Sequence, residues 1–438
     1  MKKILLLTIL AISVMCTPQA REKDGWTKLF NGRNLKGWVK LNGNAEYRVE
    51  NQEIVGVSTP NTPNTFLATE KRYGDFILEL EYKVEAGVNS GIQLRSQSKP
   101  EYQNGRVYGY QCEIDPSAYS GGIYDEARTG WLYDLRNEPV AQKAFKLSEW
   151  NKLRVEAVGH SIRVWLNGVP TTDLIDDKDA EGFIALQVHE IGKSKIGKTI
   201  RWRNIRIKTE NLESELSAPI TEISQQNHVA NYLSEREAAA GWKLLWNGKD
   251  LSGWKSNYGN ADFQKGWKVE DGTLVIKPKS GAGDIVTVEK YHDFELQVDF
   301  KLTPGANSGI KYFIGMNGSV GCEFQILDDE KHPDAKAGRD GNRRLASLYD
   351  IMPAEGWKYA DKYGWNRARI VVKGNHVEHW LNGHKLIEYE KGTKVWDEMI
   401  AKSKFAKVKN FAGGDGGHIL LQDHNDQVSY RNLKIREL

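Results

Sequence analysis

Two short segments of this sequence place a glutamine and a histidine two residues apart. The segment GFIALQVH ends in Gln187 and His189, and GHILLQDH ends in Gln422 and His424. Every second side chain of an extended strand points to the same face, so the members of each pair would share one surface. Because an imidazole can transfer protons near neutral pH and an amide can hold a hydroxyl group, the pairs are candidates for acid-base chemistry or polar ligand binding.

Carboxylates and amides alternate in two further segments. YQCEID carries Gln111 and Glu113 on one strand face, and CEFQILDD carries Glu323, Gln325 and, past the strand end, Asp328. Glu and Gln exchange places between the two segments. This exchange suggests that the face needs one carboxylate and one amide while their order is free. A solvated strand face without function is the alternative.

A Tyr-Asp pair also recurs, as Tyr124-Asp125 and Tyr349-Asp350. The second pair follows a long polar loop, DDEKHPDAKAGRDGNRR, which contains Arg339. Long polar loops beside a sheet often build binding sites. A carboxylate, a histidine and an arginine brought together could serve as base, acid and anion stabiliser. The same residue types could bind a divalent metal ion, but no DxDxDG, HExxH or CxxC spacing specifies one.

The segments that would position these side chains occur twice in the sequence. GWTKLFNGRNLKGW is answered by GWKLLWNGKDLSGW, NSGIQLRS by NSGIKYFI, WNKLRV by WNRARI, VWLNG by HWLNG, and WRNIRI by YRNLKI. Five matches in one order indicate duplication. We expect one domain at 25–210, a polar connector at 211–240 and a second domain at 241–438. Within the connector, Ser234 is a candidate cap for a short helix over 235–239.

The dominant period within each repeat is two. DFILELEYKVE and DFELQVDFKLT alternate apolar with polar residues, which is typical of half-buried strands, and LNG before a further alternating run predicts a hairpin. The sequence therefore predicts an all-β protein made of two tandem antiparallel sandwiches joined by a short, partly helical linker.

Composition limits the classes of ligand. The chain has 438 residues and a net charge of +3, with no sustained basic run in either half, so it lacks the positive field that gathers nucleic acid. Its 14 Trp and 18 Tyr suit sandwich cores and the stacking of sugar rings. Cys112 and Cys322 occupy corresponding positions in the two repeats, so each is expected to be a small buried hydrophobe rather than half of a disulfide.

The N-terminal segment MKKILLLTILAISVMC reads as an export signal, because two lysines precede an apolar run too short to span a bilayer. We assign residues 1–20 to this signal. Cys16 resembles the lipid-modified cysteine of bacterial lipoproteins. The expected location is the bacterial cell envelope, as a periplasmic protein or an outer-membrane lipoprotein that meets the membrane only through its signal or lipid anchor.

The motifs GWxxLFNG, NSGI, EFQILDDEKHPDAKAGRDGNRRLASLYD, LNG, LQDH and RNLKI together resemble the 3-keto-disaccharide hydrolase domain. The resemblance covers nearly all of 25–210 and 241–438. It implies two concanavalin-like jelly rolls and a 3-keto-glycoside substrate, and therefore a sugar 3-dehydrogenase acting upstream. Such a ketone acidifies the hydrogen at C2, so a weak base could start β-elimination of the C1 substituent, with water adding afterwards.

On this resemblance we assign roles in the second repeat: Glu323 or His424 as base, with Arg339 and Tyr349 near the enolate or the leaving group. The residues expected to contact substrate hydroxyls are Gln325, Asp328, Asp350 and Gln422, and in the first repeat Gln111, Glu113, Tyr124, Asp125, Gln187 and His189. No long loop precedes Tyr124, so the first repeat is expected to bind rather than react. No cofactor is specified, although a divalent metal ion held by His and Asp could stabilise the enolate.

Three other functions compete with this assignment. The strongest is a non-catalytic carbohydrate-binding envelope lipoprotein, since two copies of a binding face raise avidity without chemistry. A conventional glycosidase would need two carboxylates across one cleft, and the Glu/Gln exchange argues against two obligatory acids on that strand. A purely structural envelope protein leaves the repeated Gln-x-His without a purpose.

Overall fold

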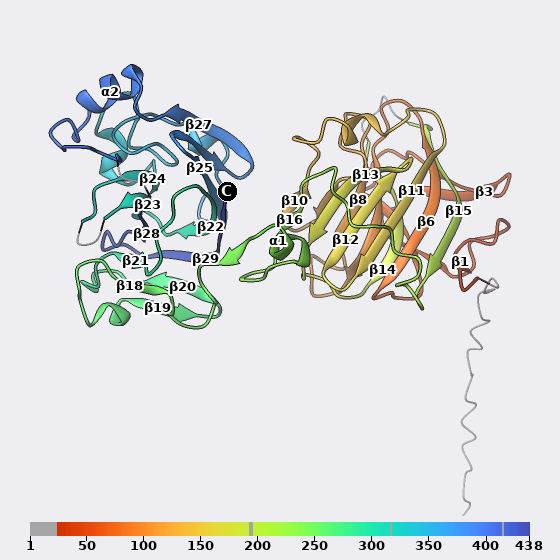
Figure 1. The fold of residues 1–438 in the computed structure, drawn as a ribbon. Helices are drawn as coiled ribbons and strands as arrows, with labels where there is room; N and C mark the ends of the chain where they lie inside the picture. Colours follow the sequence, from red (N-terminus) through yellow and green to blue (C-terminus); the bar gives the residue numbers. More distant parts are fainter. Residues whose placement is uncertain (1–23, 192–195, 316–317, 414–415) are drawn as a thin grey trace, which may run out of the picture. The chain divides into compact units, whose positions relative to one another are not determined.

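The computed structural model describes residues 24–191, 196–315, 318–413 and 416–438 (Figure 1). The chain divides into two compact units, Met1–His228 and Val229–Leu438. The predicted export signal with Cys16 lies outside the described residues. No helix in the described ranges is long and apolar enough to cross a membrane.

The first unit is a sandwich of two sheets, antiparallel throughout except where β16 runs parallel to β13. Its nine-stranded sheet has the order β16 (Gln226–Asn227), β13 (Val169–Ile175), β12 (Ser161–Leu166), β11 (Asn151–Val158), β6 (Phe76–Val84), β15 (Thr199–Lys208), β4 (Glu53–Val57) and β3 (Glu46–Glu50), with β1 (Thr27–Lys28) also on β15. Its seven-stranded sheet has the order β10 (Gly130–Tyr133), β9 (Ile123–Glu126), β8 (Val107–Ile114), β7 (Ser90–Ser98), β14 (Phe183–Val188), β5 (Thr65–Thr69) and β2 (Trp38–Asn42).

The second unit repeats this plan with fewer strands. Its eight-stranded sheet has the order β19 (Trp267–Glu270), β20 (Thr273–Ile276), β29 (Val428–Glu437), β22 (Phe294–Leu302), β25 (Asn366–Lys373), β26 (His376–Leu381) and β27 (His384–Glu390), with β17 (Lys243–Leu244) on β29. Its five-stranded sheet has the order β18 (Trp254–Ser256), β21 (Ile285–Thr287), β28 (His418–Leu421), β23 (Asn307–Ile314) and β24 (Cys322–Leu327). Helix α2 (Lys394–Ala401) follows β27 and is capped by the Thr393 side chain.

Alternation explains how each sandwich closes. In β6 the side chains of Leu78, Leu80 and Tyr82 enter the core, while Glu79 and Glu81 face outward and pair with arginines of neighbouring strands. Burying one apolar face of each sheet against the other is the main source of stability for such folds. The prediction of an all-β chain with two tandem jelly-roll sandwiches is confirmed.

The short sheet of each unit is buried on both faces along its central strands. In β8 the side chains of Tyr110 and Cys112 enter the core, yet Gln111 and Glu113, which point the other way, are also buried. Cys322 is buried in the second core, and both thiols are free, as predicted. We call the face of each short sheet that points away from the core its outer face.

The predicted connector divides between the units. Ile220 and Ile223 pack into the first core, and β16 extends the first unit's larger sheet. Helix α1 (Glu235–Ala239) belongs to the second unit, and Ser234 forms the predicted cap as part of a capping box with Glu237.

Candidate active site

The outer face of the first unit carries a hydrogen-bonded carboxylate. Asn89 Nδ2 donates to Glu113 Oε1 at 2.7 Å, and Gln111 Nε2 donates to Glu113 Oε2 at 2.8 Å. Gln93 Nε2 in turn donates to Gln111 Oε1 at 2.6 Å. Asn89, just before β7, and Gln111, in β8, therefore hold both oxygens of Glu113 in fixed positions.

Burial controls the protonation of this carboxylate. Only 6% of Glu113 is exposed, and this burial raises its pKa to about 7, although the hydrogen bonds from Gln111 and Asn89 oppose the rise. A carboxyl with a pKa near the working pH can both accept and return a proton. Glu113 therefore has the protonation behaviour of a general acid-base group.

Glu113 lies in a hollow of about 870 Å³ on this outer face. Tyr124 and His189, two of the residues expected to contact substrate, line the same hollow, whereas Gln187, which was expected to share a surface with His189, does not. Trp131, of which 38% is exposed, also lines it and packs edge-on against Tyr124 with ring centroids 5.3 Å apart. The hollow is large enough for a small saccharide, and its aromatic side could stack on a sugar ring.

A second carboxylate, Glu126 of β9, lines the same hollow. Its burial raises its pKa, while the guanidinium of Arg106, 3.6 Å away, opposes the rise. The hollow therefore contains two carboxylates whose protonated forms are favoured by burial. Glu126 was not among the predicted site residues, although it lies two residues after Tyr124 in β9 and therefore shares its face.

The second unit has the same pair with the order exchanged. In the amide orientation that satisfies both ends of Gln325, Nε2 donates to Glu323 Oε1 at 3.1 Å and to the carbonyl of Ser308 at 3.2 Å, and Oε1 faces the side chain of Asn307. Gly309 makes room for this arrangement, because a Cβ there would lie 2.2 Å from Glu323 Oε1. Gly91 does the same for Gln111 in the first unit, with a Cβ-to-Cδ distance of 2.4 Å.

Two lysines face Glu323. Lys311 of β23 is directly opposite Glu323 in the strand register, and its Nζ lies 3.6 Å from Oε2. Burial raises the pKa of Glu323, whereas Lys311 and Lys404 oppose the rise. Burial also lowers the pKa of Lys404, whose Nζ lies 4.0 Å from the centroid of the Tyr349 ring. These cations could stabilise negative charge that develops beside Glu323.

Tyr349 is held in a chain of charged groups. Its hydroxyl donates to Asp334 Oδ2 at 2.8 Å, and Arg343 Nη1 donates to Asp334 Oδ1 at 2.9 Å. Arg343 Nε also donates to Asp350 Oδ1 at 2.6 Å. Because the phenol proton is engaged by Asp334, the free lone pairs of the Tyr349 oxygen are suited to accept a hydrogen bond from a ligand hydroxyl.

The predicted role of Arg339 is not supported by its position. Its side chain is 44% exposed, donates to the carbonyl of Lys402 and lies 3.7 Å from Asp340. The arginine beside Tyr349 is Arg343, whose Cζ lies 5.5 Å from the centroid of the tyrosine ring. Strand parity could not separate these arginines, because both lie in an irregular loop.

Two of the carboxylates predicted to bind substrate instead organise loops in the second unit. Asp328 accepts from the backbone N–H groups of Gly305, Glu330 and Lys331 and from the hydroxyl of Tyr363. Asp350 accepts from Arg343 through one oxygen and from Lys404 N through the other.

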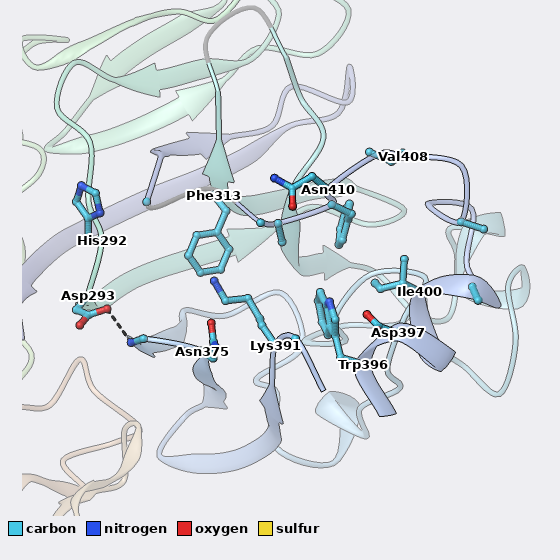
Figure 2. Close-up of a pocket in the computed structure, with 18 residues that line it drawn as sticks. His292, Asp293, Phe313, Asn375, Lys391, Trp396, Asp397, Ile400, Val408 and Asn410 are labelled. Carbon is cyan, nitrogen blue, oxygen red and sulfur yellow. Dashed lines mark hydrogen bonds between the residues drawn. The ribbon is translucent and has the colours of Figure 1, made fainter. Parts of the chain in front are cut away.

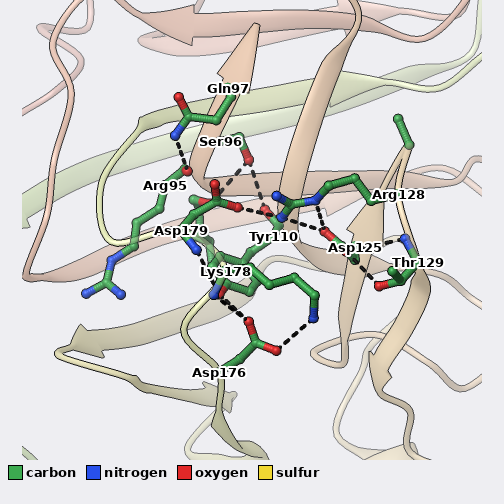
Figure 3. A network of polar contacts seen from close by, with 12 residues as sticks. Arg95, Ser96, Gln97, Tyr110, Asp125, Arg128, Thr129, Asp176, Lys178 and Asp179 are labelled. Carbon is green, nitrogen blue, oxygen red and sulfur yellow. Dashed lines mark hydrogen bonds and ion pairs between the residues drawn. The ribbon is translucent and has the colours of Figure 1, made fainter. Parts of the chain in front are cut away.

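Asp125 is likewise structural (Figure 3). It accepts from Arg128 Nε at 2.8 Å and from the hydroxyl of Thr129 at 2.7 Å. Arg128 also contacts Asp179, so the guanidinium joins two carboxylates. Asp125 is fully buried, and the alternation of β9 sends it to the opposite face from Tyr124 and Glu126.

The repeated Gln-x-His pairs behave differently in the two units. Gln187 is fully buried, and neither of its amide atoms has a hydrogen-bond partner among the described residues. Gln422 is partly buried and directly follows the last residue of β28. Its backbone N–H donates to the carbonyl of Gly309 in β23, as in the strand pairing. His424 lies beyond that strand, exposed, and its ring centroid is 5.8 Å from that of His332.

Glu323 lies in β24 on the outer face of the five-stranded sheet, whereas His424 lies past the end of β28, in the segment that leads to β29. Lys311 lies opposite both Glu323 and Leu420, and Gln422 follows Leu420 on the same face. Asp284 interacts with the charges of both Lys311 and His424. Burial raises the pKa of Asp284, and these two side chains lower it in part.

Another hollow of about 870 Å³ in the second unit lies at the C-terminal end of β23, and Glu323 is not among the residues that line it (Figure 2). Phe313 lines it, with Lys391 Nζ 3.6 Å from its ring centroid. The corresponding residue of the first unit is Arg95, which has the same left-handed backbone and donates to Asp75 and to the carbonyls of Gly74 and Gly159. The hollow thus lies where the first unit has a buried guanidinium.

Several residues of these faces were missed by the sequence analysis. Lys311, Asn89 and Asn307 have the strand parity that would have placed them on the outer faces. Lys404 and Trp131 carry no such signal, because Lys404 follows a helix and Trp131 belongs to an edge strand.

Comparisons with known proteins agree with this duplicated architecture. A family model described as the 3-keto-alpha-glucoside-1,2-lyase-like domain matches residues 25–208 and again 241–436. A 3-keto-disaccharide hydrolase of Bacteroides thetaiotaomicron is 34% identical over 232 residues, which is 46% of this chain and 79% of the relative. A crystal structure of a putative glycosyl hydrolase from Parabacteroides distasonis is 32% identical, covering 48% of this chain and 99% of that one, with a TM-score of 0.43. A second such structure from the same organism is 28% identical, covering 45% and 99%, with a TM-score of 0.36. The chain therefore belongs to the 3-keto-alpha-glucoside-1,2-lyase-like family, whose domain it contains twice.

Proposed function

We propose that this protein cleaves glycosides whose sugar carries a ketone at C3, by removal of the C2 proton and β-elimination. The observation that carries the proposal is a buried carboxylate with a raised pKa, paired with an amide, on the outer face of each unit. Family membership and the curated relative support the 3-keto substrate.

A weak base is sufficient for this reaction, because the C3 ketone acidifies the hydrogen at C2. A carboxylate takes the C2 proton, and the C2–H electron pair forms an enolate with the C3 oxygen. The enolate then collapses, the bond from C1 to the glycosidic oxygen breaks, and the leaving oxygen takes a proton. Water adds across the resulting C1–C2 double bond, which returns a proton to C2, so the net change is hydrolysis.

In the second unit we assign Glu323 as the base, with His424 as the alternative. Lys311 and Lys404 are positioned to stabilise the enolate charge. Gln325, Gln422 and the oxygen of Tyr349 offer hydrogen bonds to sugar hydroxyls. Arg343, Asp334 and Asp350 hold Tyr349 and the loop around it.

The first unit is a second candidate for the reaction, beyond the binding role expected from its sequence. Glu113 has a pKa of about 7 and lies in a formed hollow with Tyr124 and His189. A base of this pKa is half ionised at neutral pH, which suits proton removal from a carbon next to a ketone.

Replacing the two bases separately and together tests the proposal. We expect Glu113→Gln and Glu323→Gln each to remove the activity of its own unit, and the double variant to lose about 10²- to 10⁴-fold in turnover of a 3-keto-glucoside. Glu378→Gln, on the outward side of the other sheet, is the matched control and should retain activity. A double variant with undiminished turnover would remove both carboxylates from the mechanism.

One observation favours a second candidate function, conventional glycoside hydrolysis in the first unit. Glu113 and Glu126 line one hollow, and burial raises the pKa of both, so the site has the two carboxylates that such a reaction uses. This function predicts cleavage of unoxidised glycosides and loss of that activity in Glu126→Gln. A carbohydrate-binding role alone predicts no product from either substrate.

The substrate and the N-terminus suggest a setting for the reaction. A C3 ketone arises by oxidation of the C3 hydroxyl, so we propose that a sugar 3-dehydrogenase acts upstream. We also propose that the N-terminal signal exports the chain to the cell envelope, with Cys16 as a lipid anchor. Mass spectrometry of the mature protein would test the anchor.

A further inference from the structure

Three side chains that commonly bind metals meet at one end of the second unit's outer face. They are His332, His424 and Asp426, and each offers a ligand atom within 4.8 Å of the others. They come from two segments far apart in sequence. His332 lies in the long loop after β24, whereas His424 and Asp426 lie between β28 and β29.

Backbone hydrogen bonds orient two of these side chains, Asp426 and His332. Asp426 Oδ2 accepts from Asn307 N at 3.0 Å, which fixes the direction of its carboxylate. His332 caps the 3-10 helix Pro333–Lys336, and its Nδ1 accepts from Asp334 N at 3.2 Å. Nε2 of His332 could bind a cation only in the tautomer that carries the proton on Nδ1, so metal binding there would replace the hydrogen bond from Asp334 N. Small rotations would bring the three donors within bonding distance of one ion.

We propose that His332, His424 and Asp426 bind one divalent transition-metal ion. Two imidazoles and one carboxylate suit Mn²⁺, Co²⁺, Ni²⁺ or Zn²⁺, whereas Ca²⁺ requires six to eight oxygen ligands. Three protein ligands leave coordination positions open, which is typical of catalytic rather than structural metal sites.

The ligands connect directly to the residues around Glu323. Asn307, which orients Asp426, also bonds Gln325, the partner of Glu323. Asp334, which follows His332 in the same turn, accepts the hydroxyl of Tyr349. An ion in this position could coordinate the ketone oxygen and a neighbouring hydroxyl of a 3-keto sugar and so stabilise the enolate. This role rests on the function proposed above.

The first unit lacks the same set. His189 corresponds to His424, but Ile191 stands at the position of Asp426, and the first unit has no long loop to supply a counterpart of His332. The metal site therefore distinguishes two units that share a fold, and the expected stoichiometry is one ion per chain.

A competing cluster lies elsewhere in the second unit. His376, Glu378 and Glu388 also offer donors within 4.8 Å of one another. Lys385 contacts both of these glutamates, with Nζ to oxygen distances of 3.3 and 2.6 Å, so an ammonium already balances their charge. A metal ion there would have to displace this lysine.

Titration of the metal-free full-length chain with Co²⁺ tests the proposal, read by calorimetry and by the visible absorption of the bound ion. We expect one ion per chain, and at least 100-fold weaker binding in His424→Ala and in the conservative variant Asp426→Asn. His376→Ala and His189→Ala are the matched controls and should bind as the unaltered chain does. Circular dichroism verifies that each variant is folded.

Absence of binding, binding unchanged in folded Asp426→Asn, or binding lost in His376→Ala would each overturn the assignment. Because binding is measured without substrate, failure of the metal site and failure of the proposed reaction are distinguishable. Turnover of a 3-keto-glucoside by a chelated chain at the rate of the loaded chain would contradict the role in the reaction while leaving the reaction itself intact.

Discussion

At the scale of single residues, the same carboxylate-amide pair is built in two orders. Gln111 bonds Glu113 in the first unit, and Gln325 bonds Glu323 in the second. An asparagine at the start of the preceding NSGI segment contacts the second member in each case, a carboxylate in the first unit and an amide in the second. The exchange moves the carboxylate by two residues along the strand, so that Glu323 lies opposite Lys311. In the first unit the residue that corresponds to Lys311 is Gln93, and it lies opposite Gln111.

The raised pKa of Glu113 predicts a pH-dependent stability. The folded state holds this proton up to a pH of about 7, whereas an unfolded chain releases it near 4.5. The contribution of Glu113 to the free energy of unfolding is therefore present at low pH and is lost as pH rises through 7. The difference corresponds to about 3 kcal/mol. We expect Glu113→Gln to gain stability relative to the unaltered chain at pH 8 but not at pH 4, measured by urea unfolding. An equal change in stability at both pH values would contradict a raised pKa of Glu113 in the folded state.

Lys311 should set the pH range over which Glu323 acts. Replacing it with Met removes a positive charge 3.6 Å from the carboxylate, and loss of that charge favours the protonated form. We expect the acidic limb of the pH-rate profile of the second unit, measured in a Glu113→Gln background, to move to higher pH. Lys255→Met, on edge strand β18, is the control. An unmoved limb would show that Glu323 is not the titrating base.

At the scale of elements, the glycine of each NSGI strand gives its neighbour room to reach across the outer face. Gly309→Ala would place a Cβ 2.2 Å from Glu323 Oε1, although the backbone conformation there tolerates alanine. We expect at least a tenfold loss of kcat in the second unit with little loss of stability, because the carboxylate is the part that must move. Gly315→Ala, whose Cβ meets nothing within 4 Å, is the control. Full activity in Gly309→Ala would mean that the position of Glu323 is not critical.

The bulge at the end of the NSGI strand carries a structural residue in one unit and borders a hollow in the other. Arg95 is 1% exposed and bonds two backbone carbonyls and Asp75. We expect Arg95→Met to destabilise the first unit by about 2–4 kcal/mol, because those carbonyls lose their donors. Thermal unfolding would measure the loss, with Arg72→Met as the exposed control. An unchanged melting temperature would show that water replaces the guanidinium.

Strand parity predicted the outer faces well, because the alternation of polar and apolar residues fixes which side chains share a surface. It placed Gln111 with Glu113 and Glu323 with Gln325 correctly. It could not predict the loops, where Asp328 and Arg339 have partners that depend on the packing of distant segments.

At the scale of the whole molecule, duplication produced two faces with different chemistry. The first has an open hollow whose lining includes the carboxylates of Glu113 and Glu126 and an aromatic side, and the second has lysines and the His332, His424 and Asp426 group. The sequence revealed the duplication directly, because five motifs recur in order. The sequence favoured the second unit as the reactive one because of its long loop. It could not show the hollow of the first unit, because residues of several strands form that hollow only when the chain is folded.

Because each unit has its own core, the two activities should be separable. We expect Glu113→Gln and Glu323→Gln to have different residual substrate preferences among 3-keto-glycosides, and the residual activities to sum to that of the unaltered chain. Steady-state kinetics of both variants on the same substrates would measure this. If either single variant lost all activity while remaining folded, independent sites would be contradicted.

Hydrogen exchange at C2 of the sugar tests the central claim most directly. A 3-keto-glucoside is cleaved in deuterated water, and the 3-keto-glucose product is examined for label at C2 by NMR, with free 3-keto-glucose incubated alone as the control. We expect deuterium at C2 beyond that control, and its loss in the Glu113→Gln, Glu323→Gln double variant. A product formed at full rate that retains its original hydrogen at C2 would contradict it.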